Sequence, residues 1–554
     1  MEKGQELTAE ELLCKEVEEQ FKRLQKERKS LERGWELNLN FVNGNQYCTV
    51  AAGEITSVDK TYDWEQRRVF NHIAPIVDTR LSKLSRIRPA LAVRAASDEE
   101  DDIKASSLAS AILSAVQEEC DLDGVMSEAT MWSEICGTAF YKIVWNSGGG
   151  KQVGATESGT AVKDGSVKIC AVSPFEIYPA SLSEESLENQ TAIIHAKILP
   201  VASIADMYGV ELAGRDISEF RQPCAHSKST VTDERLNTGS NYELVLERYM
   251  RSSSAKPEGR LTVVAGGKLL YDGALPYVNG ADGMRCYPFV KQTSLPSAGS
   301  FFGSSVVERL IPLQRAYNAV KNRRHEYLNR ISMGTVAVED GSVDVDELTD
   351  GGLAPGKVII YRQGGTPPEM LTLGNVPDEF WKEEESLLAE FTKISGTGDL
   401  SENADSFAGV TSATGLQLIL EQDDARLNMA YQSLKRAVKN IGRQILRLYR
   451  QFATDVRLLR YAGKDGRSQM IFFKGSDISG DDVVLDADTD LNMTPAQRKA
   501  VIYELIDRGL FSDENGRMST RAKTKILEAL GYASFANVIP DDSVNEEGKD
   551  KHGN

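Results

Sequence analysis

The stretch that decides the fold is FFGSSVVERLIPLQRAYNAVKNRRHEYLNRIS, residues 301–332. After Ser304, apolar side chains recur in it every three or four residues, a spacing that predicts one amphipathic helix. Pro312 has no backbone N–H group to donate, so we expect the helix to bend near this residue. The helix is unusually long for a globular chain, and the segments on both sides of it can be interpreted by their relation to it.

Downstream of this stretch the sequence predicts a small β module, a helix, a loop and a second long helix. Residues 334–375 are rich in Gly and Pro and contain two short apolar runs, TVAV and KVIIY, which predict two strands. Residues 377–395 have helical spacing, so two helices bracket the module. Residues 396–412 form a polar loop. A near-heptad apolar stripe from Leu420 to Phe452 then predicts the longest element of the protein.

Upstream, the chain changes from helical to β-rich. Residues 8–37 have the spacing of an amphipathic helix that we expect to end near Gly34. Two further helices are expected, at 73–86 and as one continuous helix at 103–136. From Ala139 onward, short β-branched and aromatic runs alternate with Gly, Ser and Asp clusters. The middle of the chain is therefore predicted to be rich in strands.

The C-terminal part carries two predicted strands, QMIFFKG and DDVVLDADTDL, followed by helices. Thr494, with Pro495 after it and Gln497 three residues on, has the pattern of a capping box that opens a helix. A final helix is expected at about 519–530, and the residues after 540 are expected to be a polar tail.

The composition limits the classes of protein to consider. The chain has 554 residues, enough for about three or four folding units. Lys and Arg number 64 against 82 Asp and Glu, a net charge of −18, which argues against a protein whose main task is to grip nucleic acid. No window is apolar enough for a membrane helix, and the acidic N-terminus is unlike a secretory signal. The seven cysteines form no Cys-x-x-Cys pair, so we expect reduced thiols.

No familiar catalytic or cofactor motif appears in the sequence. None of the five Gly-Lys pairs is followed by Ser or Thr, which excludes a Walker A loop, and the five histidines share no ligand spacing. Asp486, Asp488 and Asp490 imitate a calcium loop, but Leu491 and Gln497 stand where such a loop needs Gly and Glu. We therefore expect no enzyme, no catalytic or metal-binding residues and no cofactor.

Two basic stretches depart from the acidic composition. Six bases stand against one acid between Arg309 and Arg330, and seven bases stand against no acid between Ala425 and Thr454. Each is interpreted either as a solvated or ion-paired helix face, or as a surface that contacts phosphates or a partner subunit. The candidate residues are Lys321, Arg323, Arg324 and Arg330 in the first stretch, and Arg436, Lys439, Arg443, Arg447 and Arg450 in the second.

The order of predicted elements resembles that of the portal proteins of tailed bacteriophages. Four segments carry the resemblance over roughly residues 10–535. They are WELNLNFVNGNQY (35–47), VFNHIAPIVDTRLSKLSRIRPALAVRAAS (69–97), GTAFYKIVW followed by VSPFEIYP, and 301–332.

The resemblance implies an α+β fold, mainly helical, with a β-rich wing, two stem helices that bracket a small β clip, and one very long wing helix. It distributes the chain as follows: wing 1–300, stem helix 301–333, clip 334–375, second stem helix 376–395, channel loop 396–412, long wing helix and strands 413–490, short helical crown 491–535, and flexible tail 536–554.

The resemblance also implies a function. A portal is a ring, expected here to have twelve subunits, at one capsid vertex of the virion, and it is assembled in the host cytoplasm. DNA is pumped in through it by the terminase and later leaves. The implied partners are the terminase large subunit, a head-completion adaptor or tail protein, capsid and scaffolding proteins, and loosely held double-stranded DNA. No membrane is implied.

Two sets of site residues follow from the resemblance. The channel loop would present Gly396, Gly398, Asp399, Leu400, Glu402, Asp405, Phe407 and Gly409. The clip would contact the packaging motor or the head-completion adaptor through Val338, Glu339, Asp340, Lys357, Tyr361 and Arg362. Two other classes stay open at this point. A coiled-coil structural or scaffolding protein would account for the long heptad helix but not for the β-rich middle, and a cytoplasmic enzyme would lack any motif for its chemistry.

Overall fold

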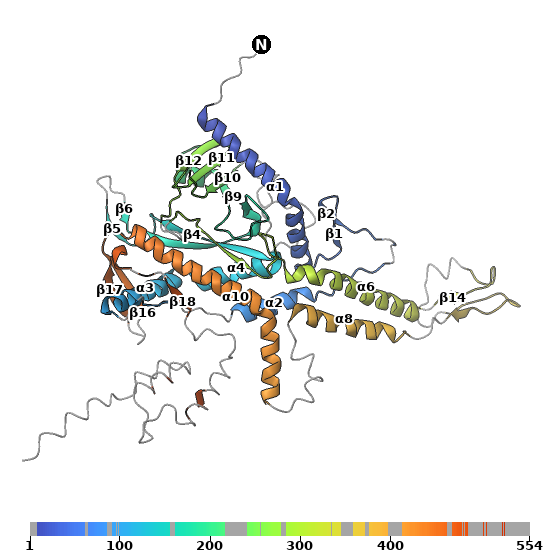
Figure 1. The fold of residues 1–554 in the computed structure, drawn as a ribbon. Helices are drawn as coiled ribbons and strands as arrows, with labels where there is room; N and C mark the ends of the chain where they lie inside the picture. Colours follow the sequence, from blue (N-terminus) through green and yellow to red (C-terminus); the bar gives the residue numbers. More distant parts are fainter. Residues whose placement is uncertain are drawn as a thin grey trace, which may run out of the picture.

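A computed structural model describes most of the chain between residues 8 and 485. The parts of this range outside the description are residues 61, 63–64, 86–90, 96, 98, 156–160, 216–240, 255, 279–283, 334, 345–357, 372–375, 397–412, 463–467, 479 and 481. Beyond 485 the described residues are 502, 503, 506, 523 and 526. The described chain is a mixture of helices and antiparallel sheets, as expected for an α+β protein (Figure 1).

The first helix is longer than predicted. Helix α1 (Ala9–Val42) begins with a capping box in which Thr8 and Glu11 exchange side-chain to backbone hydrogen bonds. The expected end near Gly34 is wrong. A glycine lowers helix propensity, but Trp35 and Phe41 beyond it are buried in the main core, and this packing offsets the local cost.

The next helices include one confirmed prediction and one error. Helix α2 (Ile73–Ser85) lies where it was expected. The single helix predicted from Ile103 to Cys136 is instead two, α3 (Glu100–Glu119) and α4 (Leu122–Cys136). Between them Asp121 adopts a left-handed conformation with φ of 46°, and its side chain accepts a hydrogen bond from the Gly124 N–H group. The apolar spacing continues through this corner, so periodicity alone did not reveal the break.

The predicted β-rich middle is confirmed and consists mainly of two antiparallel sheets. The larger has the order β12-β11-β10-β9-β8 and the smaller the order β13-β4-β7. Their strands are β4 (Thr138–Asn146), β7 (Ser166–Val172), β8 (Ile177–Pro179), β9 (Ala192–Pro200), β10 (Tyr242–Met250), β11 (Arg260–Ala265), β12 (Lys268–Gly273) and β13 (Phe289–Thr293).

Short elements complete this region. They are the hairpins β1 (Cys48–Ala51) with β2 (Glu54–Ser57) and β5 (Gln152–Ala155) with β6 (Ala161–Lys163), the 3₁₀ turn η1 (Pro174–Glu176) and helix α5 (Val201–Tyr208). Gly137 joins α4 to β4 with φ of 87°, and a Cβ atom there would lie 2.3 Å from the Gly303 carbonyl oxygen. Only glycine permits both this conformation and this close approach.

Three long helices follow as predicted. Helix α6 (Val306–Met333) contains Pro312, helix α8 (Glu379–Ser395) packs beside it, and α10 (Ala413–Phe452) is the longest element. Figure 1 shows the α6–α8 hairpin extending away from the sheets, and it also shows α10 changing direction along its length. The hairpin is therefore anchored to the body at one end only.

A small two-stranded sheet lies at the far end of this hairpin (Figure 1). Its strands are β14 (Thr335–Ala337), as predicted, and β15 (Glu369–Leu371), which was not predicted. The strand predicted from the run KVIIY is wrong over its described part, because Val358 and Ile360 are 82% and 84% exposed and form no strand. An apolar run becomes a strand only where a neighbouring strand pairs with it, and here β14 pairs with β15 instead.

The last described elements return to the body. Strands β16 (Arg457–Ala462) and β17 (Ser468–Phe473) form a hairpin, and the turn η3 (Gly475–Asp477) follows. Strand β18 (Val483–Leu485) pairs with β3 (Leu91–Val93) and packs against Gly442 of α10. Strand β17 confirms a predicted strand, and β16 was missed. Most of the segment 491–554 lies outside the described residues. Of the helices predicted from 495 and at 519–530, only residues 502, 503, 506, 523 and 526 are described, and these are helical.

One large core and two smaller clusters of buried apolar side chains hold the described elements together. The large core includes Trp35, Phe140, Phe175, Phe301 and Ile441, from both halves of the chain. The first half of α1 instead packs its apolar face on the five-stranded sheet. The body is thus built around α10 and the sheet β13-β4-β7, and the α6–α8 hairpin starts at its edge.

Candidate functional site

The α6–α8 hairpin is held together by a charge cluster on Glu384. Its carboxylate accepts hydrogen bonds from the side chains of Lys321 and Arg324 and, at 3.2 Å, from the hydroxyl of Tyr317. The Arg324 guanidinium also lies 4.1 Å from the centre of the Trp381 ring. Because Glu384 is only 9% exposed, this cluster fixes the two helices against each other.

A ladder of polar side chains binds an extended segment along α6. Four α6 side chains, spaced by four residues, each accept a hydrogen bond from a backbone N–H group in the segment 66–72. The pairs are His72 with Gln314 (3.0 Å), Phe70 with Asn318 (3.0 Å), Arg68 with Asn322 (3.1 Å) and Gln66 with Glu326 (3.0 Å).

The ladder is possible because the helix and the extended segment advance by nearly the same distance between successive hydrogen bonds. Four helical residues rise about 6 Å, and two residues of extended chain span about 6.6 Å. The side-chain amides of α6 also donate hydrogen bonds to the extended segment. Gln314 donates to the Phe70 carbonyl oxygen, and Asn322 donates to the Arg68 carbonyl oxygen. Asn318 donates to the Gln46 side chain at 2.6 Å. The base of the hairpin is thereby tied to the N-terminal part of the chain.

A buried ion pair fixes the end of α8. The Nε atom of Arg80 in α2 lies 2.5 Å from the carboxylate of Glu134 in α4, and the two side chains are 3% and 0% exposed. Arg80 also donates to the carbonyl oxygen of Ser395 at 2.9 Å, in the last turn of α8. Ser294 donates to the other carboxylate oxygen of Glu134 at 2.7 Å, and Ser305 donates to the Glu134 carbonyl oxygen. This network, the Arg80–Glu134 clamp, sets the point from which the segment after α8 departs.

The module at the tip of the hairpin carries the predicted contact residues. Glu339 accepts a hydrogen bond from the Thr366 N–H group at 2.7 Å, and this bond lowers the pKa of its carboxyl group. Asp340, Tyr361 and Arg362 are exposed. Val338 is half-buried, and Lys357 lies outside the described residues. The tip thus exposes charged and apolar side chains together.

The basic stripe of α10 lies on its polar side. Lys439 and Arg443 approach the carboxylate of Asp482 at 3.7 and 4.0 Å, and Arg450 donates to the Ile478 carbonyl oxygen. Arg436 and Arg447 lie on the other flank of the stripe and line a groove. In the first basic stretch, Arg323 is exposed, and the side chain of Arg330 is outside the description.

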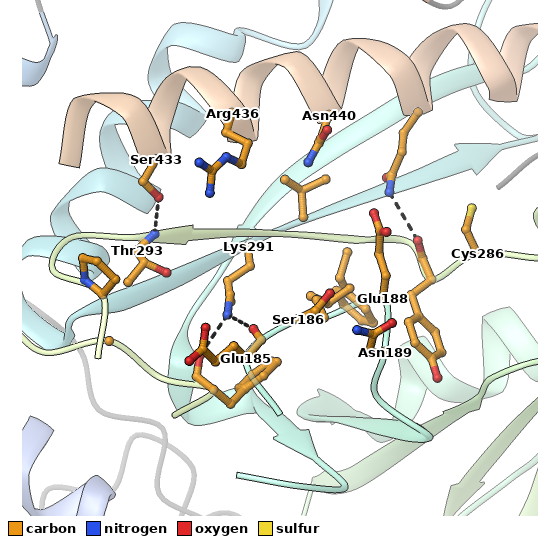
Figure 2. Close-up of a pocket in the computed structure, with 18 of the residues that line it drawn as sticks. Glu185, Ser186, Glu188, Asn189, Cys286, Lys291, Thr293, Ser433, Arg436 and Asn440 are labelled. Atoms are coloured by element: carbon orange, nitrogen blue, oxygen red, sulfur yellow. Dashed lines mark hydrogen bonds between the residues drawn. The ribbon is translucent and has the colours of Figure 1, made fainter. Parts of the chain in front are cut away.

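This groove lies between α10 and residues 185–189, with β13 along it (Figure 2). Its volume is about 790 Å³. Ser433 of α10 accepts a hydrogen bond from the Thr293 N–H group at 2.8 Å. Lys291 donates to the carbonyl oxygens of Glu185 and Phe301, and burial lowers its pKa to about 8. The two walls are therefore fixed by hydrogen bonds.

A buried charge cluster joins the two main sheets. Lys142 of β4 binds the carboxylate of Glu247 in β10, which also binds Lys197 and His195 of β9. Burial by itself raises the pKa of Glu247, but the positive charge of Lys142 and the contact with His195 hold it well below its ordinary value. The cluster joins Lys142 of the smaller sheet to Glu247 of the larger sheet. We therefore interpret it as a structural contact between the two sheets.

The described residues contain neither a metal-binding cluster nor a membrane-spanning helix. No group of three or more His, Cys, Asp and Glu side chains there is arranged to hold a metal ion. No helix in that part of the chain combines the length and apolarity needed to cross a membrane.

Comparison with known proteins decides the family. The family model of the phage SU10 portal protein matches residues 142–467, which is more than half of the chain. The chain belongs to this family of phage portal proteins. No curated protein matches it. Membership in the family implies a capsid-associated oligomeric ring, and it confirms the resemblance seen in the sequence.

The matched span contains most of the features described above. It runs from β4 into the β16–β17 region and includes the α6–α8 hairpin, its tip and α10. The portal protein's α1 to α4 lie before it. Of the predicted channel-loop residues, Gly396 ends α8 in a left-handed conformation with φ of 69°. The others, Gly398, Asp399, Leu400, Glu402, Asp405, Phe407 and Gly409, lie outside the described residues.

The structure reveals two sets of residues that the sequence analysis missed. Gln314, Asn318 and Asn322 stand at intervals of four, and this line of amide side chains along one face of an amphipathic helix was the available signal for the ladder. The Arg80–Glu134 clamp had no such signal, because its members lie on three different helices and a loop.

Proposed function

We propose that this portal protein forms a ring of twelve subunits at one capsid vertex, through which the terminase packages DNA and through which the DNA later leaves. Head-completion or tail proteins would dock onto the same ring. The single observation that carries the proposal is the α6–α8 hairpin, which extends from the body with a small β module at its tip, in a chain of the portal family (Figure 1).

The parts of the chain take the following roles in this proposal. The body formed by residues 1–300 and 413–490 is the wing, 301–333 and 376–395 are the stem helices, and 334–375 is the clip. Residues 396–412 are the channel loop, 491–535 the crown and 536–554 the tail. The Glu384 cluster and the polar ladder support the stem assignment, because a helix pair that surrounds a channel must resist bending.

The charge of the chain supports a channel that lets DNA slide. A net charge of −18 opposes tight binding of phosphates by counterion release. Lys321 and Arg324 of the hairpin are already bound to Glu384 within the same subunit, which fits the ion-paired interpretation of the first basic stretch. DNA would then pass the stem without being held.

The decisive experiment is electron microscopy of the purified full-length protein, with mass photometry on the same sample. A ring with a central hole and a mass of about twelve or thirteen subunits is the expected result. Rods would favour the coiled-coil alternative. A monodisperse monomer at micromolar concentration and moderate salt would contradict the proposed function.

We expect the clip to dock the packaging motor. Replacing residues 334–375 with a short Gly-Ser linker should leave rings intact but abolish binding of the terminase large subunit, because the exposed tip residues are removed. The binding is measured by co-sedimentation of the terminase large subunit with the ring. A control replaces Ala52, in the exposed turn between β1 and β2, with glycine, which suits its left-handed backbone. Equal terminase binding by both variants would contradict the clip assignment.

We expect the loop 396–412 to act on DNA in the channel. Deleting residues 399–406 should leave rings and procapsids unchanged but reduce the amount of full-length DNA that is packaged or retained. A second variant, in which Asp399, Glu402 and Asp405 become Asn, keeps the loop length and tests the charges alone. Nuclease-protected DNA per particle is the measurement. Wild-type yield of full-length DNA from the deletion would contradict the assignment.

A further inference from the structure

The groove between α10 and residues 185–189 is a rigid, preformed surface. Besides the bond between Ser433 and Thr293, Gln444 of α10 donates to the Tyr287 carbonyl oxygen at 3.3 Å, so α10 is bonded to the β13 region at two points. Lys291 holds the opposite wall. A partner that enters this groove does not have to order its walls first, which lowers the cost of binding.

The lining of the groove selects for an acidic, hydrogen-bonding partner. Basic side chains outnumber carboxylates in it, and five amide side chains also line it. The basic members are Arg251, Arg285, Lys291, Arg436 and Arg447; the carboxylates are Glu185 and Glu188; the amides are Asn189, Asn428, Gln432, Asn440 and Gln444. Arginines and amides together bind carboxylates and the backbone of an extended chain.

Arg436 is the residue that points most clearly to an external partner. It is exposed, Figure 2 shows it directed from α10 toward the groove, and within the described part of the chain it has no hydrogen-bond or ion-pair partner. By contrast, Arg285 is bound to Glu258 at 2.9 Å and Lys291 to backbone carbonyls. The guanidinium of Arg436 is thus available to a partner, whereas Arg285 and Lys291 are bound within the subunit.

We infer that this groove receives an acidic segment from a second copy of the chain. Rings are built from heterologous contacts, in which one patch of a subunit meets a different patch of the next. The chain carries 82 acidic against 64 basic residues, so a neighbouring subunit has acidic side chains in excess to meet this basic groove. The inference rests on the proposed ring and deepens it by naming one side of the subunit contact.

DNA is the less suitable occupant. Glu185 and Glu188 lie in the same groove and would repel phosphates. The neighbouring bases Lys439 and Arg443 face Asp482, which reduces the positive potential along α10. A polypeptide segment can place its carboxylates beside Arg436 and its other groups beside the amides, whereas a duplex presents phosphates throughout.

The test reverses the charge of Arg436 in the full chain. Arg436→Glu should raise the protein concentration needed for half-assembly of the ring by about tenfold or more, because it places like charges together at every subunit contact. Lys26→Glu on α1 is the matched control, since it reverses another exposed charge on a long helix. Mass photometry over a dilution series measures both, and circular dichroism confirms that both variants fold.

A cross-linking experiment identifies the occupant directly. A photoreactive p-benzoylphenylalanine replaces Gln432, which is exposed and lines the groove, in rings mixed from ¹⁵N-labelled and unlabelled subunits. Cross-links between differently labelled chains, to a peptide rich in Asp and Glu, are expected. Assembly of Arg436→Glu at wild-type concentrations, or cross-links only within one subunit or only to DNA, would overturn the inference. None of these results would contradict the proposed ring, because that proposal fails only if the wild-type protein forms no ring.

Discussion

Replacing Glu134 with alanine is expected to destabilise the protein by about 3–5 kcal/mol, since it leaves the guanidinium of Arg80 buried without its counter-charge. Arg80 is 3% exposed, so water cannot take the place of the lost carboxylate. The hydrogen bond that Ser294 donates to Glu134 is lost as well. Thermal melting and urea unfolding of the purified protein measure the change.

The matched control for this prediction is an exposed ion pair. Lys104 and Glu100 on α3 form one at 3.3 Å with side chains that are 70% and 88% exposed, so Lys104→Ala should cost less than about 1 kcal/mol. The double substitution Arg80→Met with Glu134→Leu should recover much of the loss, because it removes both charges together. If Glu134→Ala melts like the control, the clamp does not stabilise the fold.

The clamp also predicts a local effect at the start of the proposed channel loop. Arg80 holds the Ser395 carbonyl oxygen in the last turn of α8, and Gly396 follows directly. In Glu134→Ala the position of Arg80 is no longer fixed, so amide hydrogen exchange in the last turn of α8 should accelerate more than exchange in the middle of α8.

Asn318→Leu is expected to cost about 2–4 kcal/mol. The side chain is 3% exposed, and its removal leaves the Phe70 N–H group and the Gln46 side-chain oxygen without their bonds to it. Each buried polar group left unsatisfied costs about 1–3 kcal/mol. Leucine has the same branching and the same number of side-chain heavy atoms but is bulkier, so the lost hydrogen bonds and the added volume at this buried position both contribute. The urea midpoint measures the effect.

The control for the ladder is Asn329→Leu, which removes an exposed amide from the same helix, α6, and should change stability by less than about 0.5 kcal/mol. Hydrogen exchange separates a local from a general effect. The Phe70 amide should lose protection in Asn318→Leu, whereas amides in β10 should keep theirs. An unchanged exchange rate at Phe70 would show that the ladder does not hold the extended segment.

The long, strongly periodic elements were predictable from sequence. The helices at 73–86, 377–395 and 413–455 and the helix after Ser304 agree with α2, α8, α10 and α6 to within a few residues. The apolar stripe of α10 is buried along its described side chains, from Leu427 through Ile441 to Leu448. Such elements satisfy their backbone hydrogen bonds locally, so a local pattern is sufficient to identify them.

The errors arose where distant contacts outweighed the local pattern. Helix α1 continues past Gly34 because Trp35 and Phe41 enter the core, and the run KVIIY remains unpaired because β14 has β15 as its partner. Between α3 and α4, the side chain of Asp121 caps the following helix, an outcome that the apolar spacing does not encode.

The sequence by itself determined the class of fold, the order of its elements and, through diffuse resemblance, the portal family that the comparison with known proteins confirms. The tertiary structure alone decided which polar groups meet. Arg80 and Ser395 are 315 residues apart in the chain, and His72 and Gln314 are 242 apart. Hydrophobic periodicity is a property of neighbouring residues and can be read along the chain. A buried hydrogen bond or ion pair depends on geometry and burial that exist only after the chain has folded.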